Sequence, residues 1–598
     1  MTKLAHIQPI EQLQPLDFVT PGFRGLNTVE QGTLMDPGYC STATNAVIDT
    51  AGRLAARYGA TALTTTPITS SGTFTTPPNG GLSGATSATL SANFTQGVTG
   101  QYWMTFADGE TRLVTLTNGA NTVTWSNPLT AAVGLAYTIT YSVQSAWEYI
   151  GAAGAAQGII AWAGGISNNL VSPTNNLGGT GGGAINVTNG RWFFQNFNNK
   201  CVGFQAGQTP IVYTGSGTFA YIAASAGSAP TGGIGCAAFG RLWSVGSDLQ
   251  TIQYSGLLDE TDWSTTDGNA GVIDMHTIWA DGTDTVTAIF AFNASLVVCG
   301  LRHIVFFTDG RGSMLGMDPT QAYVFDVLLG TGCVSQWTVD HIGESDVVFL
   351  SPNGLQSLQR LTQNRNNPLE TLSKYNRDTI LTQLQSEVAT NISGCFNQTT
   401  GFYVLGFPVN GITWCFDMRR LYTDQVGALC SITTQWTMAL TACHSDANQN
   451  NLYLCRVNQG TICQYSNYLD ESATYSFIYL SPWMTLGQEV AQRLKLVKRI
   501  TITMYTAGNV PFTITWGVDF GNTSGNTTYT LTPLGANSQY GIGQYGLAQY
   551  GGTGSNLYIY KYPAHIKGQY HQLGFQITIN GQFALQQAQY TAKIGRIA

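Results

Sequence analysis

The sequence predicts an all-β protein: a β-propeller of about six blades with an inserted immunoglobulin-like module and a C-terminal β-sandwich. Three observations predict this class. Only 10% of the residues are charged, and glycine reaches 70 of 598 residues, well above its usual share. Thr, Asn, Ser and Gln are abundant, which is typical of many short strands joined by tight turns. A strand-turn-strand pattern also recurs along the middle of the chain.

A chain of 598 residues is long enough for roughly two to four domains. Its 43% of hydrophobic residues leave ample apolar surface to bury, so disorder is disfavoured. We divide the chain into an N-terminal arm (1–37), a lead-in segment of the propeller or platform (38–71), an inserted immunoglobulin-like β module (72–142), the β-propeller (143–475) and a C-terminal β-sandwich with a Tyr/Gly-rich loop (476–598).

The propeller prediction rests on a repeat between about residues 190 and 466. Short apolar strands recur at steps of 54, 51, 56 and 50 residues, and a period near 50 suits a four-stranded blade. Turn residues separate the paired strands, as tight hairpins require. The strand cores begin at Arg241, Ser295, Asp346, Phe402 and Leu452, an earlier hairpin spans Cys201–Phe204 and Thr209–Tyr213, and the turns include Pro352-Asn353-Gly354, Asn410-Gly411 and Asn458-Gln459-Gly460.

Unrelated hairpins in β-sandwiches would give the same turn chemistry, so a sandwich is the alternative to the propeller. The regular repeat length favours the propeller, because radial repetition is what adds a fixed period.

Residues 72–142 break this period. Alternating apolar residues at Tyr102, Met104 and Phe106 and at Tyr137, Ile139 and Tyr141 predict strands, and Asp108-Gly109 and Asn118-Gly119 supply turns. We expect an outward-facing immunoglobulin-like insertion.

Residues 476–598 are again rich in alternating strands, among them Ile500–Tyr505 and Leu573–Ile579. The run from Gln539 to Gly552 is rich in Tyr and Gly. It is either a flexible surface loop or an adaptable contact surface. Helix is scarce; the best candidate is Leu369–Ala389, with an imperfect apolar face.

No sequence motif of catalytic, cofactor-binding or metal-binding specificity is present, so we expect no enzyme, no cofactor and no metal. The seven histidines never fall at metal-ligand spacing. The eleven cysteines are scattered, mostly within strand-like runs, where we expect them to be reduced core residues. The histidines are His6, His276, His303, His341, His444, His565 and His571.

Glycan cleavage requires a pair of carboxylates roughly 5 to 9 Å apart. Two clusters in the sequence could supply such a pair. Asp259, Glu260 and Asp262 precede Trp263, and Glu344 lies near Asp346. Both clusters fall beside predicted turns, where such residues are ordinarily solvated or capping.

The net charge of −7 argues against a protein that binds nucleic acid tightly. The densest basic stretch is Arg493, Lys495, Lys498 and Arg499. This basic stretch could bind the acidic face of a partner or a phosphate backbone, or it could be a solvated strand edge.

The start of the chain has no signal-peptide pattern, and no stretch is apolar for about 18 residues. We therefore expect a protein without a membrane span, made in a cytoplasm.

A last set of segments is Asn45–Leu54, Arg57-Tyr58-Gly59, Phe239–Trp243, Ile252–Ser255, Asp262-Trp263-Ser264 and Asp519-Phe520 before the Gly-rich loop. These segments resemble the tail nozzle and hub (tail tubular protein B-like) proteins of short-tailed bacteriophages. In that family an Asn and a Gly-Arg-Leu lead to an Arg-Pro-Gly-like turn; this chain has Tyr58 in place of the proline. The resemblance spans most of residues 38–598 and rests on degenerate motifs.

This resemblance implies a non-enzymatic component of the virion tail, assembled in the host cytoplasm. Its expected partners are its own copies in a hexameric ring, the portal adaptor and other tail proteins, and tail fibres. Genomic DNA would pass through the channel without sequence-specific binding. Such a ring needs a heterologous interface that closes.

A second function class stays open. The chain has 13 Trp and 28 Tyr, and propellers often bind sugars on aromatic platforms, so a glycan-binding or glycan-cleaving propeller at a virion or cell surface is the alternative. The missing signal sequence favours the virion protein.

Overall fold

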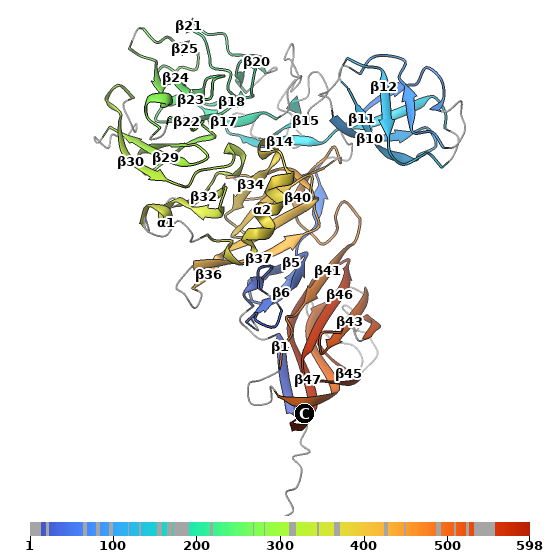
Figure 1. Cartoon of the computed structure of the whole chain (residues 1–598). Coiled ribbons are helices and arrows are strands. Elements are labelled where there is room, and N and C mark those ends of the chain that lie inside the picture. The colour runs from blue at the N-terminus through green and yellow to red at the C-terminus, as the bar shows by residue number, and fades with distance from the viewer. Residues whose placement is uncertain are drawn as a thin grey trace, which may run out of the picture.

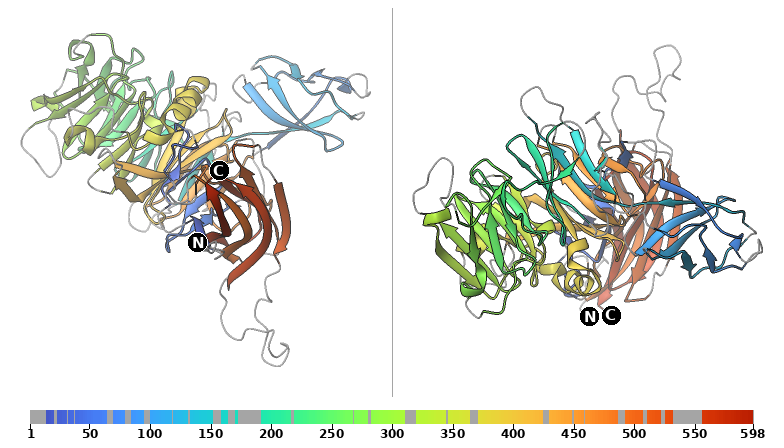
Figure 2. Two further views of the ribbon diagram at one scale, coloured as in Figure 1. Left: turned by 60° about the horizontal axis from the view of Figure 1, so that its bottom comes forward. Right: turned by 90° about the horizontal axis from the view of Figure 1, so that it is seen from above.

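The chain forms an elongated all-β molecule (Figure 1). Seven sheets gather at one end, a sandwich forms the other, and a small module projects sideways (Figures 1 and 2). The computed structural model describes residues 14–597 except 20–22, 31, 37, 64–68, 79–83, 95–99, 118, 131–132, 152–157, 164–169, 172–190, 216–218, 267, 280–281, 310–318, 344–345, 364–370, 424–428, 448–449, 458, 486–491, 507–509, 522–524 and 532–555. The Tyr/Gly-rich run lies outside the described residues.

Six of the seven are separate sheets, and the other, β34–β37, is one end of an eleven-stranded sheet that continues into the sandwich. Each begins with consecutive antiparallel strands. In chain order they are β14 (Val143–Tyr149), β15 (Gly158–Ala163) and β16 (Leu170–Val171); β17 (Phe193–Phe197), β18 (Lys200–Phe204), β19 (Ile211–Tyr213) and β20 (Ala220–Tyr221); β22 (Gly235–Ala238), β23 (Arg241–Val245), β24 (Thr251–Tyr254) and β26 (Gly271–Asp274); β27 (Ala288–Phe292), β28 (Ser295–Cys299), β29 (His303–Thr308) and β30 (Tyr323–Leu329); β31 (Asp340–Ile342), β32 (Asp346–Ser351) and β33 (Gly354–Ser357); β34 (Ser393–Asn397), β35 (Phe402–Phe407), β36 (Ile412–Thr423) and β37 (Leu429–Trp436); and β38 (Leu440–Ser445), β39 (Leu452–Arg456) and β40 (Ile462–Tyr465). The short strands β21 (Ala226–Gly227) and β25 (Asp262–Trp263) pair separately.

The first strand of each sheet lies against the first strand of the next. Contacts join β14 to β17, β17 to β22, β22 to β27, β31 to β34, β34 to β38, and β38 back to β14. Between β27 and β31, the Phe290 and His341 rings lie 6.4 Å apart, and Gln336 Oε1 accepts a bond from the Ile289 N–H at 2.6 Å. The first strands therefore follow one another around a common centre.

The repeated strand cores of the sequence are the second strands of their sheets. Arg241, Ser295, Asp346, Phe402 and Leu452 begin β23, β28, β32, β35 and β39. These strands are nearly continuous buried runs, because each lies inside its sheet between two neighbours. The described strands form seven such sheets, one more than the six expected blades. The additional sheet, β14–β16, lies upstream of the repeat recognised in the sequence.

The last of the seven sheets is completed from the N-terminal part of the chain. Strand β7 (Ala60–Ala62) pairs antiparallel with β40, and Thr61 lies opposite Gln464. The Leu63 N–H extends this seam by donating to the Ile462 carbonyl at 2.9 Å. This end of the lead-in segment thus belongs to the ring of sheets.

The inserted module is a single six-stranded antiparallel sheet. Its inward residues, such as Met104, Val114 and Ile139, are buried, as the alternation predicted. The ends of the path meet through an isolated bridge between Phe74 and Leu90. The expected immunoglobulin-like pair of sheets is therefore not what the described strands form: alternation gives the buried face but not how many sheets enclose it. The order is β8 (Thr69–Thr73), β13 (Ala136–Thr140), β10 (Gly100–Phe106), β11 (Thr111–Leu116), β12 (Thr122–Trp125) and β9 (Ser87–Thr89).

The sandwich combines strands from both ends of the chain, and the first described strand, β1, pairs antiparallel with the last, β47. The Phe477 and Phe583 rings, from opposite sheets, lie 5.1 Å apart in its core. One layer follows β45 (Asn556–Gly568), β42 (Arg493–Thr506), β47 (Phe583–Ile597), β6 (Leu54–Ala56) and β5 (Ala46–Ile48), with β1 (Gln14–Val19) on β47. The other follows β4 (Thr42–Thr44), β41 (Tyr475–Leu480), β46 (His571–Ile579), β43 (Val510–Val518) and β44 (Gly525–Leu531), and β4 joins it to β37. Strands β2 (Gly25–Leu26) and β3 (Tyr39–Cys40) pair beside β37.

Helix is scarce in the described part of the chain, as expected. The helix expected at Leu369–Ala389 is shorter: α2 spans Arg377–Ser386 and is preceded by a 3-10 turn, Lys374–Asn376. It ends because Glu387 is extended. The others are α1 (Leu358–Gln363) and the 3-10 turns η2 (Met275–Thr277), η3 (Pro319–Gln321), η4 (Gln336–Thr338) and η6 (Ala389–Asn391). In the part that the structure describes, no helix has the length and apolarity needed to cross a membrane.

Candidate functional site

The first strands of the seven sheets surround a cavity of about 660 Å³. All seven sheets contribute to its wall, through β14, β17, β22, β27, β31, β34 and β38. A volume of this size is typical of small-molecule sites. The cavity is therefore the candidate functional site.

Aromatic rings cover much of the cavity wall. The Trp337 ring packs edge-on against the Phe193 ring, with 5.2 Å between the two centroids. The Arg191 guanidinium also contacts Trp337 and lies 3.8 Å from its ring centroid. Trp147 lies 4.7 Å from the ring of His444. Among the described residues, the buried Trp147 Nε1 has no hydrogen-bond partner. A buried indole N–H without a partner is costly, so a bound polar group would be favoured there.

Asp340 is the least compensated carboxylate of the cavity. Its two oxygens accept the backbone N–H groups of His341 at 2.8 Å and Phe396 at 2.7 Å. No cationic side chain pairs with it in the part of the chain that is described. Desolvation outweighs the two bonds and raises the pKa of Asp340 to about 6.

The other acidic and imidazole groups of the wall are engaged locally. Glu148 Oε2 accepts the Ala447 N–H at 2.7 Å, and Asp446 accepts the Tyr453 hydroxyl at 2.8 Å. His444 Nε2 accepts the Glu148 N–H at 3.0 Å, which requires a neutral ring. Burial lowers the pKa of His444 to about 4, and burial also lowers the pKa of His341. The histidines are therefore neutral near pH 7.

The wall combines aromatic faces, carboxylates and amides, and its lining residues include neither Lys nor Arg. The amides come from Gln195, Asn196, Gln336, Gln398 and Asn450. Aromatic faces with a few polar groups suit a neutral, hydroxyl-rich ligand. No group of His, Cys, Asp and Glu that could hold a metal ion occurs among the described residues.

A second feature is a buried joint in the segment that carried the family resemblance. Arg57 is 0% exposed and binds both oxygens of Asp470, at 2.9 and 2.7 Å. Its guanidinium lies 4.0 Å from the ring centroid of Tyr475. A Cβ on Gly59 would lie 2.1 Å from the Leu469 carbonyl oxygen, so only glycine fits there.

Asn45 completes this joint. Its side chain accepts from Arg57 Nε at 3.0 Å and donates to the Ser476 carbonyl at 2.7 Å and to Thr437 Oγ1 at 2.8 Å. It has a left-handed backbone, with φ of 54°, which Asn tolerates better than most residues. The joint thus ties the lead-in segment to the chain just after the sixth sheet and just before the sandwich.

The carboxylates suspected in the sequence are engaged in local structure. Glu260 pairs with Lys200, Asp262 accepts from Asn269 Nδ2 at 2.7 Å, and Asp259 accepts from Thr261. Asp346 accepts the Gln359 N–H at 3.0 Å at the start of α1. Glu344 lies outside the described residues. None of the four described carboxylates, Asp259, Glu260, Asp262 and Asp346, lines the central cavity.

The basic stretch and the cysteines occupy different settings. Arg493, Lys495, Lys498 and Arg499 lie on β42 of the sandwich, where Lys495 is buried and its Nζ donates to the Gln569 carbonyl at 3.0 Å. All eleven cysteines are free thiols, ten buried and Cys443 half-buried beside the cavity.

Comparison with known proteins adds little to this picture. No family model matches the chain, and no curated protein matches it. Among solved structures, it is similar to "Kluyveromyces lactis Hsv2 complete loop 6CD", with 12% identity over 41% of this chain and 72% of that one, and a TM-score of 0.23. A likeness this slight carries no argument.

Proposed function

We propose that the seven sheets form a β-propeller of seven blades, whose last blade β7 completes. We further propose that the chain is a structural component of a bacteriophage tail, a nozzle or hub ring. In this role it forms a channel for DNA ejection and a platform for fibres and other tail proteins.

The buried joint carries this proposal. The residues that resemble the tail family, from Asn45 to Gly59, lie where the seven sheets, the sandwich and the N-terminal strands meet. The side chains of Asn45 and Arg57 in this segment bind other parts of the chain, which supports a structural role.

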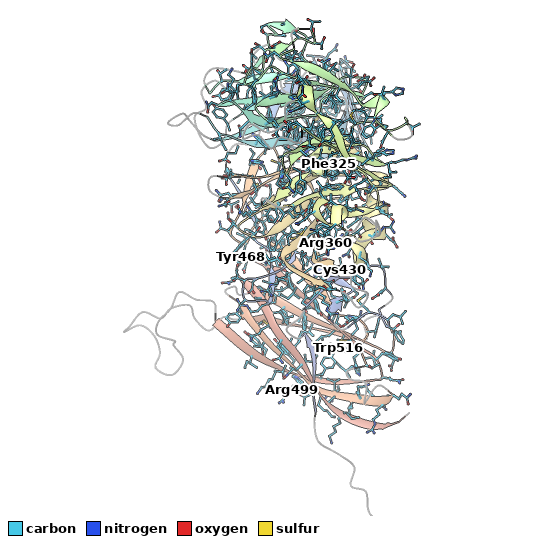
Figure 3. The ribbon with its side chains drawn as sticks, turned by 90° about the vertical axis from the view of Figure 1, so that its left-hand side faces the viewer. Phe325, Arg360, Cys430, Tyr468, Arg499 and Trp516 are labelled. Carbon is cyan, nitrogen blue, oxygen red and sulfur yellow. The ribbon has the colours of Figure 1, made fainter. Side chains whose placement is uncertain are left out.

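An exposed apolar edge supports assembly. Strand β30 ends the order of its sheet, and Tyr323, Phe325 and Leu329 on it are 52%, 66% and 61% exposed. Figure 3 shows Phe325 near the end of the molecule that holds the seven sheets. Exposed apolar strand edges are covered in most stable proteins, so this edge suits contact with another subunit or tail protein.

The test is the mass and image of the purified chain, by light scattering and negative-stain microscopy, alone and with the neighbouring proteins of the same genome. We expect a closed ring with a central channel. Changing Phe325→Ser and Leu329→Ser should weaken assembly, whereas Val409→Ser, at another exposed apolar residue, should not. A monomer that persists even with those neighbours would refute the ring.

A glycan-binding role is the second candidate, favoured by the cavity with Trp147, Trp337 and its amides. Titration with capsular oligosaccharides, followed by calorimetry, tests it. Binding should be lost in Trp337→Ala and kept in Trp103→Ala, a partly exposed tryptophan of the separate module. Absence of binding to a broad panel of oligosaccharides would count against this role.

A further inference from the structure

The charges of the chain are segregated. Residues 476–598 contain eight Lys and Arg but two Asp and Glu, whereas residues 1–475 contain 17 Lys and Arg and 30 Asp and Glu. The net charge of −7 therefore hides a basic C-terminal part and an acidic remainder.

All eight basic residues lie on three neighbouring strands, β45, β42 and β47. Asp17 of β1 is the single acidic residue among the strands of this sheet as the structure describes them. The basic residues are Arg493, Lys495, Lys498, Arg499, Lys561, Lys567, Lys593 and Arg596.

Register and burial place four of these cations on the outer face. Val497 and Ile500 are buried against the other sheet. Their neighbours Leu496, Arg499 and Thr501 therefore face outward, because successive residues of a strand alternate.

The cross-strand partners extend this outer face. Leu496 lies opposite Lys567 on one side and Lys593 on the other, and Thr501 lies opposite Lys561. Arg499, Lys561 and Lys567 are exposed, and Lys593 is half-buried. Lys495 is excluded, because it is buried and bonded to backbone carbonyls.

The spacing suits a repeating polyanion. Neighbouring strands lie about 4.8 Å apart, so the backbones at Lys567 and Lys593 are separated by about 10 Å. Lys561 and Lys567 are six residues apart on one strand, or about 20 Å. Duplex DNA carries one charge per about 1.7 Å of its axis, so several phosphates fall within this span.

The residues between the cations favour a nucleic acid over a lipid surface. Thr501, Gln589 and Thr591 share the outer face by register. Hydroxyl and amide side chains hydrogen-bond phosphate oxygens, whereas membrane insertion calls for clustered Trp, Phe or Leu.

We infer that the outer face of β45, β42 and β47 binds the phosphodiester backbone of double-stranded DNA without reading its sequence. The inference deepens the proposed tail function and rests on it for the source of the DNA. The acidic remainder of the chain repels the duplex and confines contact to this sheet. Figure 3 shows Arg499 at the opposite end of the molecule from Phe325, so the DNA face and the apolar β30 edge are well separated.

The test is fluorescence anisotropy of a labelled 30-base-pair duplex with the full chain, between 50 and 300 mM salt. We expect affinity to fall with salt, with a log-log slope of about −3 to −5. Arg499→Gln with Lys561→Gln and Lys567→Gln should weaken binding at least about tenfold at 50 mM salt and flatten the slope by about 2 to 3.

A control with the same change of net charge is Arg302→Gln with Lys374→Gln and Arg420→Gln, none of which lies on β45, β42 or β47. It should bind as the wild type does. Equal loss in both triple variants, no binding at 50 mM salt, or displacement of DNA by anionic phospholipid vesicles at lower concentration than by unlabelled duplex would overturn the inference.

Microscopy of the same samples separates this inference from the proposed function. A ring without DNA binding overturns the inference and leaves the nozzle or hub standing. DNA binding by a chain that never forms a ring supports the basic face and refutes the ring. Circular dichroism of each variant verifies that it is folded.

Discussion

Arg57 is a fully buried cation in a chain with few charges. Its charge is compensated by one anion, the carboxylate of Asp470. Removing either member of a buried ion pair leaves the other desolvated and uncompensated, which typically costs about 3–5 kcal/mol. We expect Arg57→Gln to lower the free energy of unfolding by about that amount, measured by urea denaturation.

Arg24→Gln is the matched control. Arg24 pairs with Asp36 at 2.8 Å, but the two side chains are 40% and 35% exposed. Such a pair is worth at most about 1 kcal/mol. Equal losses in the two variants would contradict the distinction between a joint and a surface pair.

Two histidines, the fully buried His571 and the half-buried His444, predict acid sensitivity. Burial lowers the pKa of both His444 and His571 to about 4, below the ordinary value of about 6.5. The folded state thus holds fewer protons than the unfolded state between these values. Stability is full above about pH 6.5 and falls as the pH drops toward 4, by up to about 3 kcal/mol for each histidine.

His571→Gln tests this dependence. His571 is fully buried, and its Nε2 lies 3.0 Å from the Gly568 carbonyl, a bond that a glutamine amide can replace. Urea denaturation at pH 7 and pH 4.5 should show a smaller loss of stability in the variant than in the wild type. An unchanged loss would exclude His571 as the titrating group.

At the scale of the elements, the seam between β7 and β40 is the prediction with the sharpest test. Leu63→Pro removes the N–H that binds the Ile462 carbonyl and so shortens the seam. We expect faster amide exchange in β38–β40 and a melting temperature lower by several degrees. Leu63→Ala keeps the N–H and should leave the exchange of β40 nearly unchanged; similar exchange in both variants would show that the side chain, not the bond, holds the seam.

The second strands of the sheets were predictable, because a strand between two neighbours is a buried run bounded by turns. Strand β35, buried at all six positions and followed by Asn410-Gly411, is an example. The seam was not predictable, because β7 pairs with a strand about 400 residues away and three residues carry too little pattern. Pairing at that distance is settled by tertiary packing.

The cavity was not predictable for a different reason. Its lining comes from the first strands, which mix aromatic and polar residues, such as Trp147 beside Glu148 and His444. These residues are separated by whole repeats, so no local motif joins them. A signal did exist in the sequence. The strand just before each buried second strand is the first strand of its sheet, and these first strands carry Trp147, Phe193, Phe290 and Phe396, which line the cavity.

At the scale of the molecule, net charge conceals how the charges are distributed. A value of −7 argues against binding of nucleic acid by the chain as a whole, whereas the basic residues of 476–598 lie on one sheet. Charge must be counted for each folding unit, since the Debye length of about 8 Å at physiological salt is far shorter than this molecule.

The N-terminal strands connect the seven sheets to the sandwich, and we expect the two parts to unfold as one cooperative unit. Strands β4, β5 and β6 lie in the sandwich and β7 lies in the last of the seven sheets, with Arg57 between them. The core of the module built from β8–β13, around Met104, continues into Tyr453 and Ile462 of the last sheet. A defect at Arg57 should therefore affect both the last sheet and the sandwich, whereas a defect at Met104 should affect the module and the last sheet but not the sandwich.

Hydrogen exchange read by mass spectrometry distinguishes these outcomes. In Arg57→Gln we expect lower protection in both β38–β40 and β41–β46, and little change in β10–β11. In Met104→Ala, which opens a cavity worth about 2–5 kcal/mol, we expect lower protection in β10–β11 and in β38–β40 and little change in β41–β46. Loss of protection on only one side of Arg57 would mean that the two parts unfold independently, and a ring built from such chains could then hinge at the joint instead of transmitting force through it.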